Sequence, residues 1–194
     1  MIRVRTACCA AALFALCAAA AELEAPEVHD TVEYRDIAGN DQDALVAALK
    51  RTGSTNANGD RFAADTRWQL RWNFRVEQQP GASCRLLSAR TDLDVHMTLP
   101  RWIPPKNASP VLVKRWNMFA DALRKHEDGH RDIAIEAARV VTDRAGAAQP
   151  ENDCKTLKQR LQRIADETLR EYRDKESSYD VTTLHGQAQG ASFQ

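Results

Sequence analysis

The sequence predicts an α+β fold in which a small antiparallel sheet packs against a long helix and a second, C-terminal helix. Residues 65–77 alternate between large apolar and polar side chains, which is typical of a half-buried strand. Residues 110–144 instead repeat apolar side chains every three or four positions, which is typical of an amphipathic helix. The chain has 194 residues, 43% of them hydrophobic, which is enough for one domain with its own core.

The charge balance and the lengths of the apolar runs exclude two classes of protein. The 27 Lys and Arg residues equal the 27 Asp and Glu residues, whereas a nucleic-acid-binding domain carries a basic surface. After residue 21 no apolar run approaches the roughly 20 residues that span a bilayer. We therefore expect no nucleic-acid partner and no stable membrane anchor in the processed chain.

The elements are expected in the order strand, helix, strand, strand, helix, helix. Residues 27–37 alternate as in a first strand, and residues 41–52 form a short amphipathic helix that an aspartate caps. After a turn-rich loop, the strand at 65–77 pairs antiparallel with a further alternating segment, residues 84–99. Pro100 is expected to end that strand.

The two long helices follow. Ser109 and Pro110 are a typical helix start, and Gly146 stops this first long helix after its apolar stripe ends. Residues 154–175 form the second long helix, with one apolar stripe. Residues 177–194 contain two glycines and few apolar side chains, so we expect an extended tail.

The first 21 residues are typical of a cleaved export signal. Arg3 and Arg5 precede an apolar segment, residues 10–21, which ends in small residues before Glu22. The rival interpretation is a lipoprotein anchored at Cys17, although Leu16 is large for that cleavage site. We expect a bacterial protein that is periplasmic or secreted after cleavage near residue 21.

Cysteine usage agrees with export. The signal contains three of the five cysteines, so the processed chain keeps Cys84 and Cys154. In an oxidising compartment two cysteines most simply form one disulfide. The alternative is a pair of buried free thiols.

The segment His126-Glu127-Asp128-Gly129-His130 is an H-E-x-x-H motif inside the long helix. Two histidines four residues apart face the same way and can bind one metal ion, for which zinc is the expected cofactor. The glutamate between them can act as general base toward a water on the metal. Gly129 is expected to leave room for substrate beside the metal. The alternative is a pair of core histidines that bind no metal.

A catalytic zinc site needs a third protein ligand and one open position. The continuation found in metzincins is missing, because Ile133 and Glu136 stand where that motif has glycine and histidine. Several residues remain candidates for the third ligand. They are His185, Glu167, Glu171, His96 and His29.

The motifs Thr98-Leu99-Pro100-Arg101-Trp102, HEDGH and Tyr179-Asp180-x-x-Thr183-x-His185-Gly186 occur together in this chain. In this combination the chain resembles the bacterial secreted family called domain of unknown function 922, described as predicted secreted zinc-dependent proteases. The resemblance covers about residues 30–187 and implies a zincin-like metallopeptidase domain at 22–187, with a flexible tail at 188–194.

Together with the glycine-rich string itself, the resemblance favours His185 as third ligand beside His126 and His130. Asp180 is then expected to accept the free N–H of a ligand imidazole, or Tyr179 to donate to the oxyanion of a tetrahedral intermediate.

Three functions compete at this point. The first is an exported zinc metallopeptidase acting on a peptide or protein substrate, with Glu127 as catalytic base. The second is a non-catalytic exported binding domain with a structural or degenerate zinc site. The third is hydrolysis of a non-peptide bond by the same residues.

Overall fold

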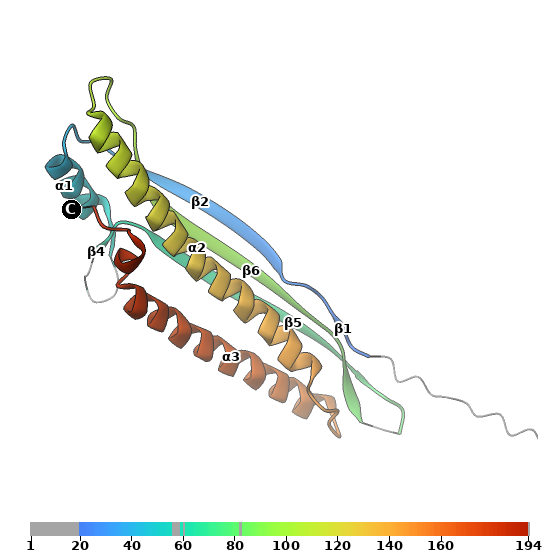
Figure 1. Cartoon of the computed structure of the whole chain (residues 1–194). Helices are drawn as coiled ribbons and strands as arrows, with labels where there is room; N and C mark the ends of the chain where they lie inside the picture. The colour runs from blue at the N-terminus through green and yellow to red at the C-terminus, as the bar shows by residue number, and fades with distance from the viewer. Residues whose placement is uncertain (1–19, 56–58, 60, 82, 194) are drawn as a thin grey trace, which may run out of the picture.

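The computed structural model describes residues 20–55, 59, 61–81 and 83–193, and two long helices lie along one face of a sheet (Figure 1). The strands are β1 (Glu22–Leu23), β2 (Glu27–Ile37), β3 (Ser54–Thr55), β4 (Arg61–Phe62), β5 (Asp65–Gln78) and β6 (Cys84–Trp102). The helices are α1 (Gln42–Thr52), α2 (Pro110–Gly146) and α3 (Cys154–Thr183), followed by the short 3-10 helix η1 (Gln187–Gln189). The predicted α+β class is confirmed.

The main sheet is mixed, so the prediction of an antiparallel sheet is only partly correct. β5 pairs antiparallel with β6 as expected. β2 instead pairs parallel with the other edge of β6, from Glu27 opposite Asp92 to Ile37 opposite Trp102. β1 extends this edge in the same parallel sense. The parallel pairing is possible because α1 and the β3–β4 pair keep the chain at the end of the sheet where β2 finishes, and β5 then carries the chain back before β6 begins.

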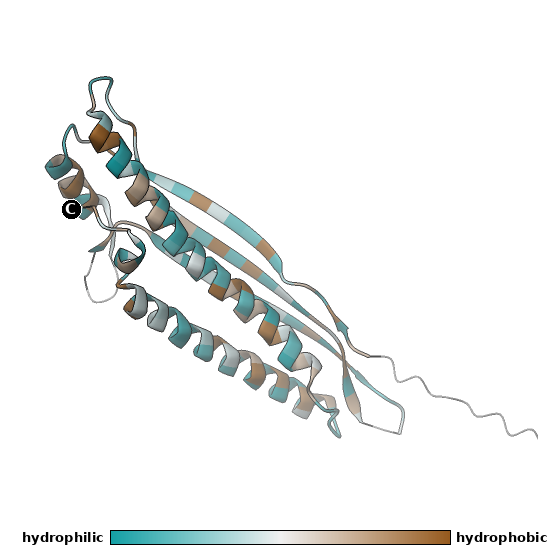
Figure 2. Cartoon of the chain, viewed as in Figure 1, coloured by the Kyte–Doolittle hydropathy of each residue, from teal (hydrophilic) through white to brown (hydrophobic). Residues whose placement is uncertain are grey.

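The strands alternate as their sequences predict, and Figure 2 shows hydrophilic and hydrophobic residues following one another along them. On β5, Leu70 is buried while its neighbours Gln69 and Arg71 are exposed. Leu93 and Val95 of β6 are also buried, because the face that they share is covered by α2. The opposite face carries the charged side chains of the sheet.

Pro100 does not end β6, which continues to Trp102. β5 pairs with β6 only as far as Thr98, so beyond that point β6 has β2 as its one neighbour in the sheet. Beyond Thr98 one edge of β6 is therefore unpaired. Pro100 has no backbone N–H, but no hydrogen bond of the sheet is lost on that unpaired edge.

α2 is held on the sheet on both sides of the H-E-x-x-H motif. Before the motif, Phe119 and Leu123 pack in one core cluster with Met97 and Leu99 of β6. After the motif, Ala138 and Val141 pack with Leu93 and Val95 in a second cluster. This packing makes the middle of α2 a rigid support for polar side chains.

α3 returns antiparallel to α2 (Figure 1), and its first residue is fixed by a disulfide. Cys154 is bonded to Cys84 at the start of β6, which confirms the predicted pairing. Asp153 caps the helix by accepting a hydrogen bond of 2.9 Å from the Thr156 backbone N–H. A disulfide indicates a location outside the cytoplasm.

The expectation of an extended segment from residue 177 is wrong. α3 continues to Thr183, and the chain then turns at Leu184 and His185, which both have positive φ. After η1, Ala191 and Phe193 are buried in the core, each 8% exposed. The composition predicted a tail because this segment has few apolar residues. One of them, Phe193, nevertheless packs against the rings of Trp116 and Phe119.

The expected export signal falls almost wholly on residues 1–19, which lie outside the described residues. Within the described part of the chain, no helix combines the length and the apolar character needed to cross a bilayer.

Candidate metal centre

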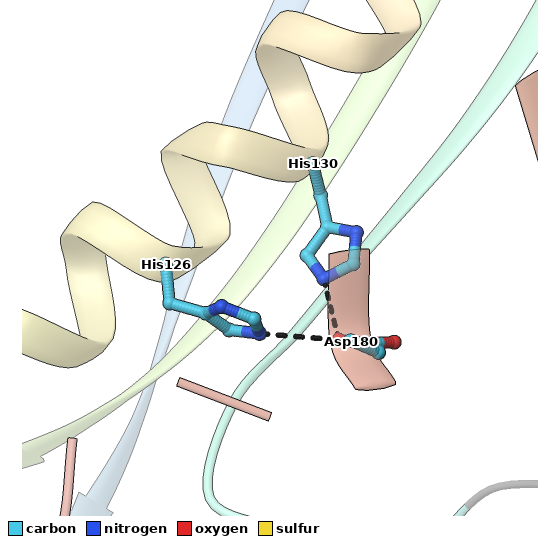
Figure 3. A group of neighbouring side chains, drawn as sticks. All are labelled: His126, His130 and Asp180. Atoms are coloured by element: carbon cyan, nitrogen blue, oxygen red, sulfur yellow. Dashed lines mark hydrogen bonds and ion pairs between the residues drawn. The ribbon is translucent and has the colours of Figure 1, made fainter. Parts of the chain in front are cut away.

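Three side chains from two helices converge on one point (Figure 3). Nε2 of His126 lies 3.2 Å from Oδ1 of Asp180, and Nε2 of His130 lies 3.0 Å from the same oxygen. One ligand atom from each residue lies within 4.8 Å of the others, which is close enough for one metal ion. The histidines come from α2 and the aspartate from α3.

The local sequence explains this convergence. His126 and His130 are one helical turn apart, and they continue the buried stripe of α2, being 3% and 7% exposed. Asp180 reaches them because α3 runs beside α2 for about eight residues beyond its predicted end at about 175 and so brings its last turns to the motif.

The electrostatics of the group resemble those of a cation site. Burial opposes protonation of His130, but the carboxylates of Asp180 and Glu176 raise its pKa to about 9. Burial likewise opposes ionisation of Asp180, yet hydrogen bonds with His126 and His130 hold its pKa well below the usual range. A proton on His130 thus balances carboxylate charge that a divalent cation would balance in its place.

The donor set fits zinc. Two imidazole nitrogens and one carboxylate oxygen are typical protein ligands of this ion. The far nitrogen of each ring faces an acceptor: His126 Nδ1 lies 3.1 Å from Gln189 Oε1, and His130 Nδ1 lies 3.4 Å from Glu176 Oε1. The His130 contact is an ion-pair distance and not a well-formed hydrogen bond, so this Nδ1 is a buried polar atom without a hydrogen-bond partner among the described residues. Acceptors behind Nδ1 favour the tautomer whose Nε2 is free to bind metal.

Glu127 is buried beside this group, with 4% exposure. Burial raises its pKa, while a 2.8 Å hydrogen bond from the Thr66 hydroxyl to Oε2 and the charges of His130 and His126 act in the opposite sense. A carboxyl group with a raised pKa that is held in one orientation suits general-base chemistry.

A cavity of about 560 Å³ opens over these residues. His126, Glu127, His130 and Asp180 all contribute to its wall, and residues 61–66 of β4 and β5 form the opposite side. The arrangement places a metal-binding group, a carboxylate base and space for a ligand at one location.

His185 also lines this cavity, but it does not belong to the group of three. Its Nδ1 lies 3.5 Å from Asp180 Oδ1, its side chain is 46% exposed, and its ring packs against Phe62 with centroids 4.6 Å apart. Its assignment as third ligand stays a prediction, while Asp180 is the residue that the geometry brings to the histidines.

The other candidates for the third ligand lie in different surroundings. Glu171 forms an ion pair with Arg144 at 2.7 Å, and Glu167 is exposed on α3. His96 and His29 lie on the sheet, where they contact Glu33 and Glu27. None of these four belongs to the metal-binding group that contains His126 and His130.

Tyr179 occupies the space beside Gly129 that we expected to remain for substrate. A Cβ atom at position 129 would lie 2.2 Å from the Tyr179 hydroxyl oxygen, so only glycine fits. The Tyr179 ring stacks on His126 with centroids 5.0 Å apart, and its hydroxyl donates to the His126 carbonyl at 3.2 Å. The structure thus shows Tyr179 as a support behind the histidine; its proposed contact with an oxyanion stays a prediction.

Three residues of the site were not identified from the sequence. They are Thr66, Glu176 and Gln189, which contact Glu127, His130 and His126 respectively. Glu176 precedes Asp180 by four positions, so both lie on one face of α3. This spacing would have indicated a pair of neighbouring carboxylates if the predicted helix had continued past residue 175. Thr66 and Gln189 carry no local signal, because each reaches the site through the tertiary fold.

Fold and site together define an α+β protein with a buried candidate metal centre between two antiparallel helices. The chain matches the model of a family described as bacterial protein of unknown function, DUF922, over residues 32–186, and it belongs to that family. The resemblance inferred from the motifs is thereby confirmed. Searches of curated proteins and of solved structures found no match.

Proposed function

We propose that the protein is an exported zinc-dependent peptidase, in which His126, His130 and Asp180 bind the metal and Glu127 is the general base. The observation that carries the proposal is the convergence of three ligand atoms beside a buried glutamate at the wall of a 560 Å³ cavity. The proposal names peptide bonds because the H-E-x-x-H arrangement is typical of metallopeptidases.

The residues of the chain divide the chemistry among them. A zinc ion, when bound, acts as a Lewis acid that activates water and polarises a carbonyl group. Glu127 accepts the proton of the attacking water at its carboxylate and passes it to the leaving amine. Thr66 holds that carboxylate in position by its 2.8 Å hydrogen bond. Residues 61–66 and α2 form walls of the cavity in which the reacting groups lie.

The alternative function is a non-catalytic domain with a structural zinc ion. Catalytic zinc sites have three protein ligands, whereas structural sites have four. The proximity of His185 to Asp180, 3.5 Å, is the observation that favours this alternative, because a fourth ligand from His185 would close the site.

Metal content distinguishes the ligand sets. We expect about one zinc ion per chain by elemental analysis of the purified protein. Asp180→Ala should lose most of that zinc, and His185→Ala should retain it. Loss in both variants would favour the four-ligand structural site. If the wild type contains no zinc even after addition of the metal, the proposal is wrong.

Activity distinguishes the two functions. We expect the zinc-loaded wild type to cleave members of a mixed peptide library, as detected by mass spectrometry. Glu127→Gln should abolish cleavage and keep the metal, because it removes the proton acceptor without removing a ligand. The matched control is Glu136→Gln on the exposed side of α2, which should cleave normally. A zinc-loaded wild type that cleaves no peptide, but hydrolyses esters or other amides, would move the proposal to a non-peptide substrate.

We further propose that the chain is exported to the periplasm or the cell exterior by the signal at residues 1–21. The sequence pattern and the Cys84–Cys154 disulfide support this. N-terminal sequencing of the processed protein should begin at Glu22. Processing immediately before Cys17, with a lipid attached, would support the lipoprotein interpretation instead.

A further inference from the structure

We propose that Gln189 is a positioning residue of the metal centre, which holds His126 in the tautomer that binds metal. This inference rests on the proposed zinc site. Gln189 lies outside the family match, which ends at residue 186, and it belongs to a segment in which the sequence predicted only a tail.

The hydrogen-bond network determines which way the Gln189 amide points. The Tyr179 hydroxyl donates to the His126 carbonyl at 3.2 Å and accepts from the Gln189 amide nitrogen, also at 3.2 Å; its contact with the Gln189 amide oxygen is longer, 3.4 Å. The amide oxygen then faces His126 Nδ1 at 3.1 Å. An amide oxygen can only accept, so Nδ1 carries a proton, and Nε2, which faces Asp180 Oδ1 at 3.2 Å, is the nitrogen left to bind a metal ion in place of its own proton.

The segment that carries Gln189 is held in place at both ends. Gly186 begins it with a φ of 82°, which favours glycine, and a Cβ atom there would make a tight contact of 3.0 Å with the His126 ring. Phe193 ends it in the aromatic pocket of Trp116 and Phe119. Backbone hydrogen bonds from Gln189 and Ala191 to the Gly186 carbonyl close the turn between these ends. The amide is therefore preorganised against the imidazole.

The test compares zinc affinities, measured by competition with a chromogenic chelator, and the visible absorption spectra of the cobalt-substituted proteins. Gln189→Leu keeps the size of the side chain and removes the acceptor, so we expect zinc to bind about 10- to 100-fold more weakly. Gln189→Glu restores an acceptor and should bind zinc as tightly as the wild type or more tightly. The matched control, Gln187→Leu on the same short helix, should leave the affinity unchanged.

Two results would overturn the inference. One is a Gln189→Leu protein that binds zinc like the wild type. The other is an equal loss in Gln189→Glu, because that would assign the effect to packing and not to the acceptor. Thermal melts of the metal-free variants check that each one is folded. Absence of zinc from the wild type would be a failure of the proposed function itself, and this inference would fall with it.

A second inference rests on a different part of the molecule. We infer that Arg173 binds a carboxylate of the substrate, which makes acidic peptides the preferred class. The main cavity adjoins a smaller hollow of about 280 Å³, and both are lined by Thr66, Arg173 and Glu176. The two hollows together form one groove between β5 and α3, which Arg67 and Trp68 continue away from the metal centre.

One guanidinium group along this groove has no partner among the described residues. Arg173 lies two turns before Asp180 on α3, and its guanidinium has no hydrogen-bond or ion-pair partner within the described part of the chain. The carboxylates nearby are already engaged: Glu176 faces His130, and Asp65 is paired with Arg35 and Arg67. A carboxylate of a bound peptide would be the first partner of Arg173, in the charge-assisted geometry that guanidinium groups favour.

The test measures kcat/KM of the zinc-loaded protein for pairs of peptides that differ only by Glu against Gln on each side of the cleaved bond. We expect the wild type to prefer the acidic peptide about tenfold at one position, and Arg173→Gln to remove that preference. Arg173→Glu should reverse the preference toward a lysine at the same position. Peptides with a free or an amidated C-terminus tell an acidic side chain from a terminal carboxylate.

Arg170→Gln, one turn earlier on α3 and outside both hollows, is the matched control and should keep the tenfold preference. Equal cleavage of acidic and neutral peptides by the wild type would overturn the inference while leaving the proposed peptidase intact. Zinc-loaded protein that cleaves no peptide would refute the proposed function, and the preference with it.

Discussion

At the scale of single residues, Gly129 has a use that helix propensity does not predict. Glycine in the middle of a helix is unfavourable by about 1 kcal/mol relative to alanine. Here it admits the Tyr179 ring, whose hydroxyl oxygen would lie 2.2 Å from a Cβ atom at this position. The tyrosine in turn stacks on His126, so the glycine sets how closely α3 approaches the metal centre.

We predict that Gly129→Ala lowers the stability of the protein by about 1–3 kcal/mol, the usual cost of overpacking a filled site. Propensity alone predicts the opposite sign, so a thermal melt decides between the two. The double variant Gly129→Ala/Tyr179→Ala should be more stable than the sum of the single effects, because the clash is absent. Additive losses would show that the contact between the two residues is not the cause.

The sequence was sufficient to identify His126, Glu127 and His130, because their chemistry depends on spacing within one helix. Asp180 was identified as a partner of the histidines, but as a residue behind a ligand, since the helix that carries it was predicted to end at about residue 175. Thr66 and Gln189 could not be identified as site residues from the sequence. Each comes from a distant segment, and only the folded chain brings it to the motif.

At the scale of elements, α2 is joined to the edge strand β2 by a two-pronged ion pair. Arg131 donates to the Asp30 carboxylate from Nε at 2.8 Å and from a terminal nitrogen at 2.6 Å. Arg131 directly follows His130, so this contact adds to the apolar packing that fixes the motif over the sheet. The Arg131 hydrogen bond lowers the pKa of Asp30 below its ordinary value of 3.8.

We predict that Asp30→Asn lowers the free energy of unfolding at pH 7 by about 0.2–1 kcal/mol, the range for exposed pairs. Because the pKa is lowered in the folded state, the stabilisation is complete above the unfolded pKa of about 3.9 and is lost as the pH falls through the folded value. Urea denaturation at pH 7 and at pH 3 should show the difference shrinking. The control is Asp132→Asn, whose carboxylate is 75% exposed and lies 3.6 Å from Arg131; it should change stability less.

The disulfide has a larger expected effect. It joins the starts of β6 and α3 across a sequence separation of 70 residues. In the chain-entropy model, removing it by the double substitution Cys84→Ala/Cys154→Ala lowers stability by about 4 kcal/mol. Urea denaturation of wild type and variant, each with and without reductant, measures this. Reductant should destabilise the wild type and leave the variant unchanged; equal curves for all four samples would refute the prediction.

Most elements could be predicted because each is encoded by its own periodicity, as β5 and α2 show. What could not be predicted was the relation between elements. The parallel pairing of β2 depends on β5 carrying the chain back and occupying the other edge of β6, and the continuation of β6 through Pro100 depends on the β5 pairing reaching no further than Thr98. The last turns of α3 are polar along most of their length and are kept helical by contacts that Tyr179 and Asp180 make with α2.

At the scale of the whole molecule, the core is separate from the metal centre. The two clusters that pack α2 on the sheet lie before and after the histidines and contain neither of them. We therefore expect the fold to be independent of the proposed ion, in contrast to small zinc-dependent domains.

We predict that removal of zinc by a chelator leaves the far-ultraviolet circular dichroism of the protein unchanged at 25 °C and lowers its melting temperature. The shift follows from ligand linkage, so it should grow with the zinc concentration above the dissociation constant. Asp180→Ala should melt at the same temperature with and without zinc. Unfolding of the wild type on chelation would contradict the separation of core and metal centre.

The two helices that form the metal centre are made at different times. Asp180 follows His130 by 50 positions along the chain, and Gln189 is later still. While the nascent chain is being synthesised or threaded through a membrane, the two histidines have neither their carboxylate nor the amide that orients them. For the proposed peptidase this order is protective. If the proposed activity is confirmed, the chain would be inert until α3 has folded back on α2, and it would not attack the machinery that delivers it.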